Sequence, residues 1–198
     1  RRCRPPEAVI VNTGGGLAGG DQVARGFQVG AGAGLVVTTQ ASERVYRSLG
    51  DQPACLDIRA TVAEDATLLW LPQETILFEG AHLDRAITVE AEASARVIIC
   101  ETLVLGRTAM GETLSTAALR DHWRIRRAGQ LAFAESVRID AAMWAAMDAP
   151  ALAGVARVIL TLLCLAPDAE ARLTPVRRAL VDAPLQCAAS AWDGKLVV

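Results

Sequence analysis

The chain has 198 residues, of which 52% are hydrophobic and 21% are charged, and its formal net charge is −2. This length and apolar fraction suit one folded core and exclude an intrinsically disordered chain. The small negative charge, without a long run of Lys or Arg, argues against binding nucleic acid by phosphate neutralisation, and no apolar stretch reaches the roughly 18–20 residues of a membrane span. We therefore expect neither a nucleic acid nor a membrane as a partner.

The first distinctive stretch is the glycine-rich segment "VNTGGGLAGGD", residues 11–21, which follows a short apolar run. Gly14, Gly16 and Gly19 match the G-x-G-x-x-G spacing of a dinucleotide-binding turn, but that turn needs a helix directly after it. The residues that follow alternate between apolar and polar and then include Gly30, Gly32 and Gly34, each of which costs a helix about 1 kcal/mol. We therefore predict a tight backbone turn that sets Asp21 near neighbouring strands.

The middle of the chain carries the alternation that is typical of half-buried strands. Residues 86–93, "AITVEAEA", alternate with period two, and so do the segments on either side of a turn at 127–130. Gly129 supplies the unusual backbone angle of that turn, so we predict antiparallel strands linked by hairpins. Residues 97–105 are apolar on both faces except at Glu101 and Thr102, which predicts a strand covered on both sides and a sheet system of at least two layers.

Helix signals come late in the chain. The alanine-rich stretch "AAMWAAM", residues 141–147, predicts a short helix, and a strand is expected over residues 154–166. Pro175 suits the first turn of a second helix that is capped by Thr174 and runs to about residue 182. The "DG" pair at 193–194 predicts the turn of a final hairpin.

Together these elements predict a mainly β fold of layered, antiparallel or mixed sheets, with a small α/β part at the C-terminal end and few helices. We see no internal repeat, low-complexity segment or linker, so residues 1–198 are expected to form a single domain.

The cysteines indicate a reducing compartment. Five of them are scattered, mostly within apolar runs, at positions 3, 55, 100, 164 and 187. This odd, dispersed set predicts reduced, buried thiols in a cytoplasmic protein. With no C-x-x-C pair and with His82 and His122 as the two histidines, a closed tetrahedral metal site is disfavoured.

Four strings, taken together, resemble those of the family of urease accessory proteins called UreD or UreH. They are "VNTGGGLAGGD" at 11–21, "TTQASERVYRS" at 38–48, "LLWLPQETILFEGA" at 68–81 and "ETLVLGRTAMGE" at 101–112. The resemblance runs from about residue 8 to the C-terminus, where "WDGKLVV" is similar to the near-terminal strand of the family. Family members usually carry further segments before and after this region, so a trimmed UreD-like domain is expected; "GGG" also replaces the commoner Ala-Gly-Gly.

The resemblance implies a non-enzymatic role in urease maturation. UreD-like proteins bind a UreF-type partner, join a UreG-type partner that hydrolyses nucleotide, and dock on apo-urease so that nickel reaches its active site. The resemblance also implies a layered and partly helical, that is superhelical, arrangement of sheets. No tightly bound cofactor is expected, since nickel would be held only transiently.

The candidate site residues are carboxylates at positions where the pattern predicts burial. Glu101 lies within an apolar strand, and Asp21 ends the glycine-rich string. Glu135 is predicted to face inward on one face with Leu131, Phe133, Val137 and Ile139. Burying a carboxylate is costly unless it is paired, hydrated or bound to metal. Oxygen ligands hold divalent nickel loosely compared with imidazole or thiolate. We therefore hypothesise that Glu101, Glu135 and Asp21 line a polar internal path for Ni²⁺.

Two other interpretations stay open. Each carboxylate could instead close on an arginine, such as Arg44, Arg47 or Arg107, in a structural protein-binding module without a metal path. A nucleotide-binding enzyme is favoured only by the glycine spacing and is opposed by the residues that follow it.

Overall fold

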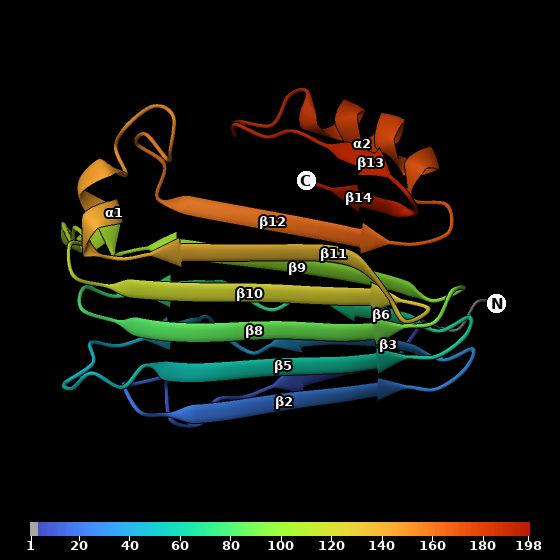
Figure 1. Ribbon diagram of the computed structural model, residues 1–198, viewed down its shortest axis with the longest axis horizontal. Coiled ribbons are helices and arrows are strands. Elements are labelled where there is room, and N and C mark those ends of the chain that lie inside the picture. The colour runs from blue at the N-terminus through green and yellow to red at the C-terminus, as the bar shows by residue number, and fades with distance from the viewer. Residues whose placement is uncertain (1–3) are drawn as a thin grey trace.

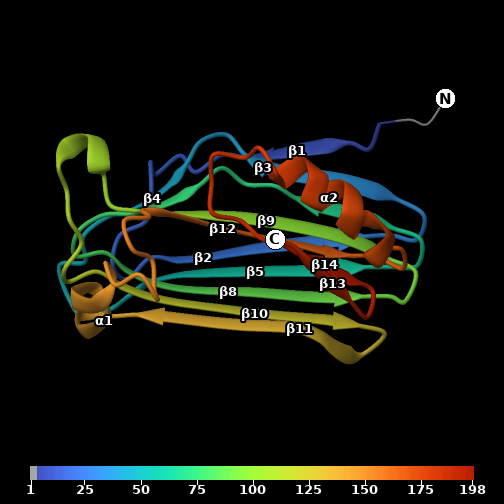
Figure 2. The same ribbon diagram turned by 90° about the horizontal axis from the view of Figure 1, so that it is seen from above.

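The computed structural model describes residues 4–198, and β-strands dominate it (Figure 1). They form two sheets that are stacked as two layers, with the helix α2 (Leu173–Leu180) on the outer side of the larger one (Figure 2). The larger sheet has nine strands in the order β1, β3, β6, β9, β12, β14 and β13, with β7 beside β9 and β4 beside β7. The smaller sheet has five strands in the order β11, β10, β8, β5 and β2. The mainly β, layered prediction is therefore confirmed.

The strands of the larger sheet are β1 (Glu7–Ile10), β3 (Gly34–Thr39), β4 (Glu43–Val45), β6 (Thr67–Trp70), β7 (Thr75–Leu77), β9 (Arg96–Leu105), β12 (Val158–Leu165), β13 (Ser190–Trp192) and β14 (Lys195–Val197). Those of the smaller sheet are β2 (Gln22–Val29), β5 (Ala54–Val62), β8 (His82–Ala91), β10 (Ala118–Arg127) and β11 (Gln130–Ile139).

The chain coils back and forth between the two layers. A strand of the smaller sheet is followed by one or two strands of the larger sheet, and the chain then returns to lay its next strand beside the first. As a result β2, β5, β8 and β10 are parallel to one another, and so are β3, β6 and β9. This arrangement is solenoid-like, although the sequence contains no repeat that predicts it. The coils share the alternation of apolar and polar residues, but the residues at equivalent positions differ.

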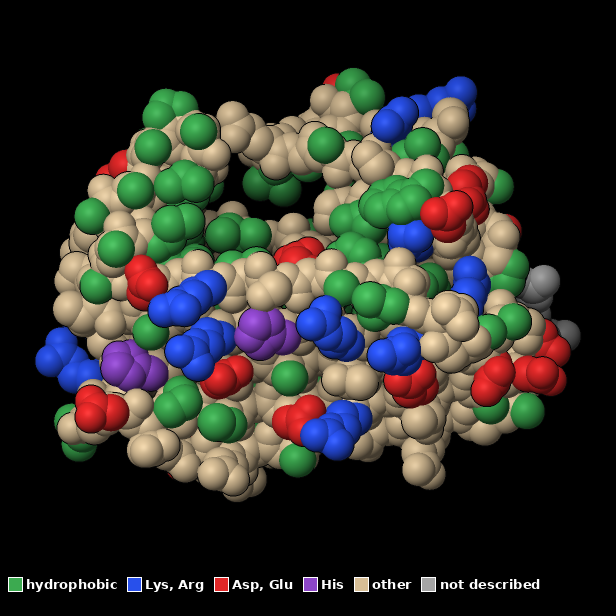
Figure 3. All heavy atoms as spheres, in the orientation of Figure 1, with side chains coloured by type: hydrophobic (Ala, Val, Ile, Leu, Met, Phe, Trp, Pro, Cys, Tyr) green, Lys and Arg blue, Asp and Glu red, His purple; other side chains and the backbone are tan. Residues whose placement is uncertain are grey.

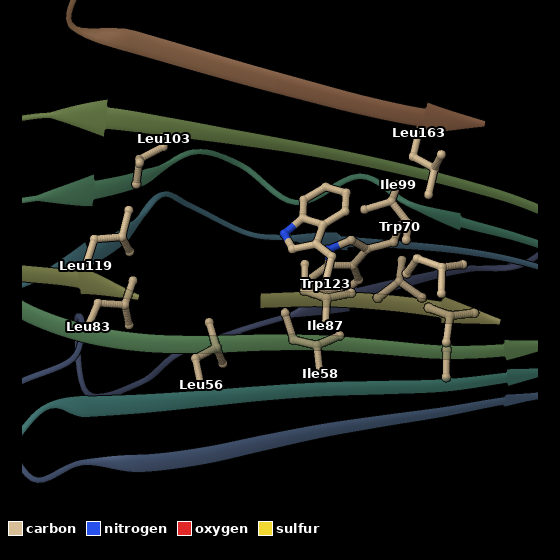
Figure 4. Close-up of a cluster of buried hydrophobic side chains, with 14 of the residues drawn as sticks. Leu56, Ile58, Trp70, Leu83, Ile87, Ile99, Leu103, Leu119, Trp123 and Leu163 are labelled. Atoms are coloured by element: carbon tan, nitrogen blue, oxygen red, sulfur yellow. The ribbon is translucent and has the colours of Figure 1, made fainter. Parts of the chain in front are cut away.

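The main core fills the space between the layers (Figure 4). The side chains that meet there come from both sheets and include Leu56, Ile58, Leu83, Ile87, Leu119 and Trp123 from the smaller sheet, and Trp70, Ile99, Leu103 and Leu163 from the larger one. Each such side chain contributes up to about 1.5–3 kcal/mol by leaving water. Any charged group between the layers is therefore held in an environment that penalises it unless it is paired.

The predicted strand directions are correct in one place and wrong in another. The hairpin of β10 and β11 is antiparallel and its turn holds Gly129 at positive φ, both as predicted. Ala128, before it, also has positive φ. However, β8, which contains the alternating residues 86–91, is parallel to both of its neighbours. Period-two alternation indicates which face of a strand is buried, but not whether the strand is parallel or antiparallel to its neighbours. Here the strand direction is set by the way the chain coils between the layers.

The strand β9 is covered unequally on its two faces. Its inner face is buried, whereas the other face is only half-buried, so the prediction of two covered faces holds in part. A second, smaller cluster formed by the C-terminal part covers this outer face, and Ile98 packs against Cys164 and Leu196 there.

The C-terminal elements follow the predictions closely. The helix α1 (Ala141–Ala146) is capped by Asp140, and α2 spans Leu173–Leu180. Thr174 was predicted as the cap of α2 but lies in its first turn, because a 3₁₀ turn at Glu170–Arg172 leads directly into the helix. The β13–β14 hairpin turns at Asp193 and Gly194, both at positive φ, as the "DG" pair predicts.

Not every thiol is buried. Cys164 is buried, Cys55 and Cys100 are half-buried, and Cys187 is exposed, so the prediction of buried thiols is wrong for Cys187. Cys3 lies outside the described residues. None of the helices within residues 4–198 is long and apolar enough to cross a membrane.

Candidate functional site

The glycine-rich segment forms a turn and is followed by the strand β2, so the helix that a dinucleotide site requires is absent from this point of the described chain. Gly16 has φ of 150°, and a Cβ atom there would lie 2.5 Å from the carbonyl oxygen of Arg44. The glycine is therefore needed because two stretches of backbone approach each other closely.

An ion pair lies under this turn, and we call Asn12, Arg25 and Glu43 the glycine-loop cluster. Arg25 Nη2 lies 2.5 Å from Glu43 Oε2, and the amide Nδ2 of Asn12 donates to Glu43 Oε1 at 2.7 Å. One arginine thus meets one carboxylate, and both carboxylate oxygens are satisfied. A groove of about 310 Å³ lies beside the cluster, between the glycine-rich turn and residues 39–44.

Asp21 lies in an exposed position directly before β2. Its Oδ2 accepts a hydrogen bond from the backbone N–H of Ala18 at 2.8 Å, which closes the turn. Since β2 and β11 are the opposite edges of the smaller sheet, the structure does not bring Asp21 to Glu135.

A second group of charged side chains lies between the layers, and we call Arg85, Glu101, Asp121 and Glu135 the interior cluster. Arg85 of β8 is 2% exposed and binds both Glu101 of β9 and Asp121 of β10. Its Nη1 lies 2.5 Å from Glu101 Oε2, and its Nε and Nη2 donate to the two oxygens of Asp121 at 3.0 and 2.6 Å. The planar guanidinium therefore holds two buried carboxylates from two different sheets.

Glu101 is fully occupied by these contacts. Its second oxygen, Oε1, accepts a hydrogen bond from Trp70 Nε1 at 2.5 Å. The interpretation in which a buried carboxylate closes on an arginine is thus correct for Glu101, although the arginine is Arg85 and not Arg44, Arg47 or Arg107.

The charges of the interior cluster shift its pKa values. Burial alone would lower the pKa of Arg85, but the carboxylates of Glu101 and Asp121 raise it above its ordinary value. Burial, and to a smaller extent the charge of Glu101, also raise the pKa of the neighbouring Cys100 thiol. Arg85 is therefore a fixed positive charge, and Cys100 is held as the neutral thiol.

Glu135 is the carboxylate of the cluster that has no ion pair within residues 4–198. It is half-buried and pairs in register with Trp123 across the β10–β11 hairpin. Burial first, and then the charge of Asp121, raise its pKa above the ordinary value, against a smaller opposing effect of Arg85. Trp123 Nε1 is buried and likewise has no hydrogen-bond partner in the described chain.

The alternation of inward-facing side chains along β11 does not extend to Leu131, near the start of the strand. Phe133, Glu135 and Val137 face inward as predicted, but Leu131 is 51% exposed. A β-bulge that shifts the register between Ile125 and Arg126 is the cause, because it turns the side chains before it to the other face.

Arg85, Asp121 and Trp70 were not among the expected site residues. Arg85 lies two residues before Ile87, and Asp121 lies two residues before Trp123, so each shares the buried face of an alternating strand. Extending the alternation by one step toward the N-terminus of each strand would have found both.

No group of three or more His, Cys, Asp and Glu side chains is arranged to hold a metal ion within residues 4–198. The donors that the interior cluster offers a cation are carboxylate oxygens, and Arg85 competes for two of the three carboxylates. Such a set can attract a divalent cation and bind it only weakly.

One stretch of apolar surface lies on β12, the strand that pairs with β9. The first half of β12 exposes Val158, Ile159 and Leu160, which are 38–56% exposed. β12 pairs with β9 along its whole length, but it pairs with β14 only from Leu163 to Leu165. Figure 3 shows the molecule hollowed above the first half of β12, with hydrophobic side chains around the hollow.

Comparison with known proteins assigns the chain to a family. A family model described as the UreD urease accessory protein matches residues 2–198. The urease accessory protein UreD of Xanthobacter autotrophicus is 47% identical over 194 residues, which cover 97% of this chain and 66% of that protein. UreD of Methylobacterium sp. is 43% identical over 197 residues, which cover 97% of this chain and 70% of that protein. UreD 2 of Methylorubrum populi is 46% identical over 194 residues, which cover 97% of this chain and 65% of that protein. The chain thus spans about two thirds of the length of these relatives.

Proposed function

This chain belongs to the UreD family of urease accessory proteins, and we propose that it acts in urease maturation as a non-catalytic scaffold for nickel delivery. In this proposal it assembles with UreF-type and UreG-type partners on apo-urease in the cytoplasm. Nickel is the cargo and is held only in passing, so no cofactor stays bound.

The observation that carries the nickel step is the charge imbalance of the interior cluster. Glu101, Asp121 and Glu135 face one arginine, Arg85, between the two layers. A set of buried and half-buried carboxylates that outnumbers its cations is costly for the fold, and a passing cation offsets that cost. This supports a role for the cluster beyond joining the sheets.

Within this proposal the three carboxylates expected from the sequence have different tasks. Glu135 binds the ion first because it has no ion pair to break, and Glu101 binds it only by exchange with Arg85. Asp21, exposed at the other edge of the smaller sheet, serves as a carboxylate at the surface and not as part of the interior.

The assembly step is supported by the apolar stretch of β12. Contiguous exposed apolar side chains on a folded protein commonly mark a surface for another protein. We assign Val158, Ile159 and Leu160 to a contact with one of the accessory partners.

The proposal is tested by producing this chain with the UreF-type and UreG-type partners and urease, and by measuring both the assembled complex and the nickel content of urease. The variant is Glu135→Gln, and its matched control is Glu64→Gln, which removes an exposed carboxylate from the turn between β5 and β6. We expect Glu135→Gln to assemble normally and to lower the nickel content, and Glu64→Gln to change neither.

The two remaining interpretations predict other outcomes. A protein-binding module without a metal path would give normal assembly and normal nickel with Glu135→Gln. A nucleotide-binding enzyme would show a rise in melting temperature with ATP or NAD, whereas we expect none for this chain alone.

A further inference from the structure

The outer face of the smaller sheet carries a row of basic side chains, which we call the basic stripe. It consists of Arg120, His122, Arg124 and Arg126 of β10, together with Arg138 of β11, all of which are exposed. Figure 3 shows this row of arginine and histidine side chains crossing the middle of the molecule. The stripe exists because β10 alternates strictly, with apolar residues or Asp121 inward and a basic residue at every outward position from 120 to 126.

The charge of the stripe is not balanced within the described chain. The outer faces of β8, β10 and β11 carry four arginines and two carboxylates, Asp84 and Glu90. Arg126 lies 3.5 Å from Glu90, and Arg138 lies 3.5 Å from Asp140, the residue after β11. Arg120 and Arg124 form no ion pair within residues 4–198. This face is therefore positive although the chain as a whole carries −2.

The arrangement also has a cost in the isolated protein. Arg120 and Arg138 are direct cross-strand partners in the β10–β11 register, and like charges in that position repel each other. An opposite charge brought by another molecule would remove this repulsion.

We propose that the basic stripe docks an acidic protein surface in the maturation assembly, and this inference rests on the scaffold role proposed above. The stripe lies on the outer face of a five-stranded sheet and presents most of its charges along one strand, which suits charge complementarity between two protein faces. It lacks the exposed aromatic side chains on which bases stack, and a chain of net charge −2 lacks the general positive field of a nucleic-acid-binding protein. The contact is separate from the apolar stretch of β12 and is electrostatic in nature.

The test compares the wild type with the double variant Arg120→Glu/Arg124→Glu in binding to two proteins separately, the UreF-type partner and apo-urease. Each dissociation constant is measured at about 50 mM and about 300 mM NaCl, on either side of the ionic strength at which exposed charges are largely screened. The matched control is Arg178→Glu, a reversal of charge at an exposed position of α2. A duplex DNA is included as a third binding partner.

We expect the double variant to bind one of the two proteins about tenfold more weakly at low salt, mainly through slower association. The difference should shrink at high salt, and Arg178→Glu should bind like the wild type. Melting temperatures should show that the double variant is folded, since both substituted side chains lie in solvent.

Three results would overturn the inference. Equal binding of wild type and double variant to both proteins would do so while leaving the scaffold role intact. Salt-dependent binding to the duplex DNA that the double variant loses would assign the stripe to nucleic acid instead. If the wild type bound neither protein, the scaffold role would fail and the inference with it.

Discussion

The glycine-loop cluster and the interior cluster both join the two sheets through an ion pair between an arginine and a glutamate. In each, an arginine on the inner face of the smaller sheet meets a glutamate of the larger sheet, Arg25 with Glu43 and Arg85 with Glu101. In each, the second oxygen of the glutamate accepts a hydrogen bond from a neutral N–H group, that of Asn12 or Trp70.

The two clusters differ in charge. The glycine-loop cluster is neutral, with one arginine and one carboxylate. The interior cluster adds Asp121 on the same arginine and Glu135 close by. A single ion pair is enough to join the layers. Joining the layers therefore does not account for the two additional carboxylates, Asp121 and Glu135.

The largest effect is expected from Arg85→Met, which leaves Glu101 and Asp121 buried without their cation. Removing one partner of a buried ion pair costs about 3–5 kcal/mol in the free energy of unfolding. Urea denaturation at neutral pH measures it, and a loss below about 1 kcal/mol would show that the interior is open to water.

Arg25→Met should cost less, about 1–3 kcal/mol, because Glu43 keeps its hydrogen bond from Asn12 and lies beside a groove that water can fill. The same urea experiment gives the value. If Arg25→Met cost as much as Arg85→Met, the excess carboxylates would not distinguish the two clusters.

Gly16→Ala tests the turn above the glycine-loop cluster and should cost about 2 kcal/mol, because the new Cβ would strike the carbonyl oxygen of Arg44. Gly15→Ala is the control, since Gly15 also has positive φ but open space around it, and should cost about 1 kcal/mol. Thermal unfolding of the two variants should rank them in this order, and the reverse order would mean that close approach is not what the glycine serves.

The smallest effect is expected from Glu135→Gln, and its sign depends on pH. The folded pKa of Glu135 is raised, so as pH rises above the ordinary value of 4.5 the unfolded chain loses this proton before the folded chain does. The wild type therefore loses stability as pH rises through this window, while Glu135→Gln does not. Unfolding curves at about pH 4 and about pH 7 give the free energy of unfolding of both proteins. The difference between them should shift in favour of the variant at the higher pH. A constant difference would contradict the raised pKa.

Much of the fold follows from local patterns in the sequence. The β10–β11 and β13–β14 hairpins, the helix α1 and the turn at the glycines each depend on a few adjacent residues. The parallel stacking of β2, β5, β8 and β10 depends instead on the connections 30–53, 63–81 and 92–117, which pass through the other layer and which alternation does not encode.

The candidate site was predicted in part. Glu101 and Glu135 stand out because each is a carboxylate on an apolar face, and both lie inside. Their surroundings could not be read in the same way, because Arg85 and Asp121 reach them only through the pairing of β8, β9 and β10 in two sheets. Asp21 was placed near neighbouring strands by its string, but its carboxylate closes its own turn.

In the function proposed above, nickel passes over Glu135, the carboxylate of the interior cluster that has no ion pair within residues 4–198. The most direct measurement is the rate at which the purified complex of this chain with its UreF-type and UreG-type partners activates apo-urease at limiting nickel. We predict that Glu135→Gln slows activation at an equal amount of complex while Glu64→Gln does not. Equal rates for Glu135→Gln, Glu64→Gln and wild type would contradict the proposed nickel path and leave the interior cluster with a structural role only.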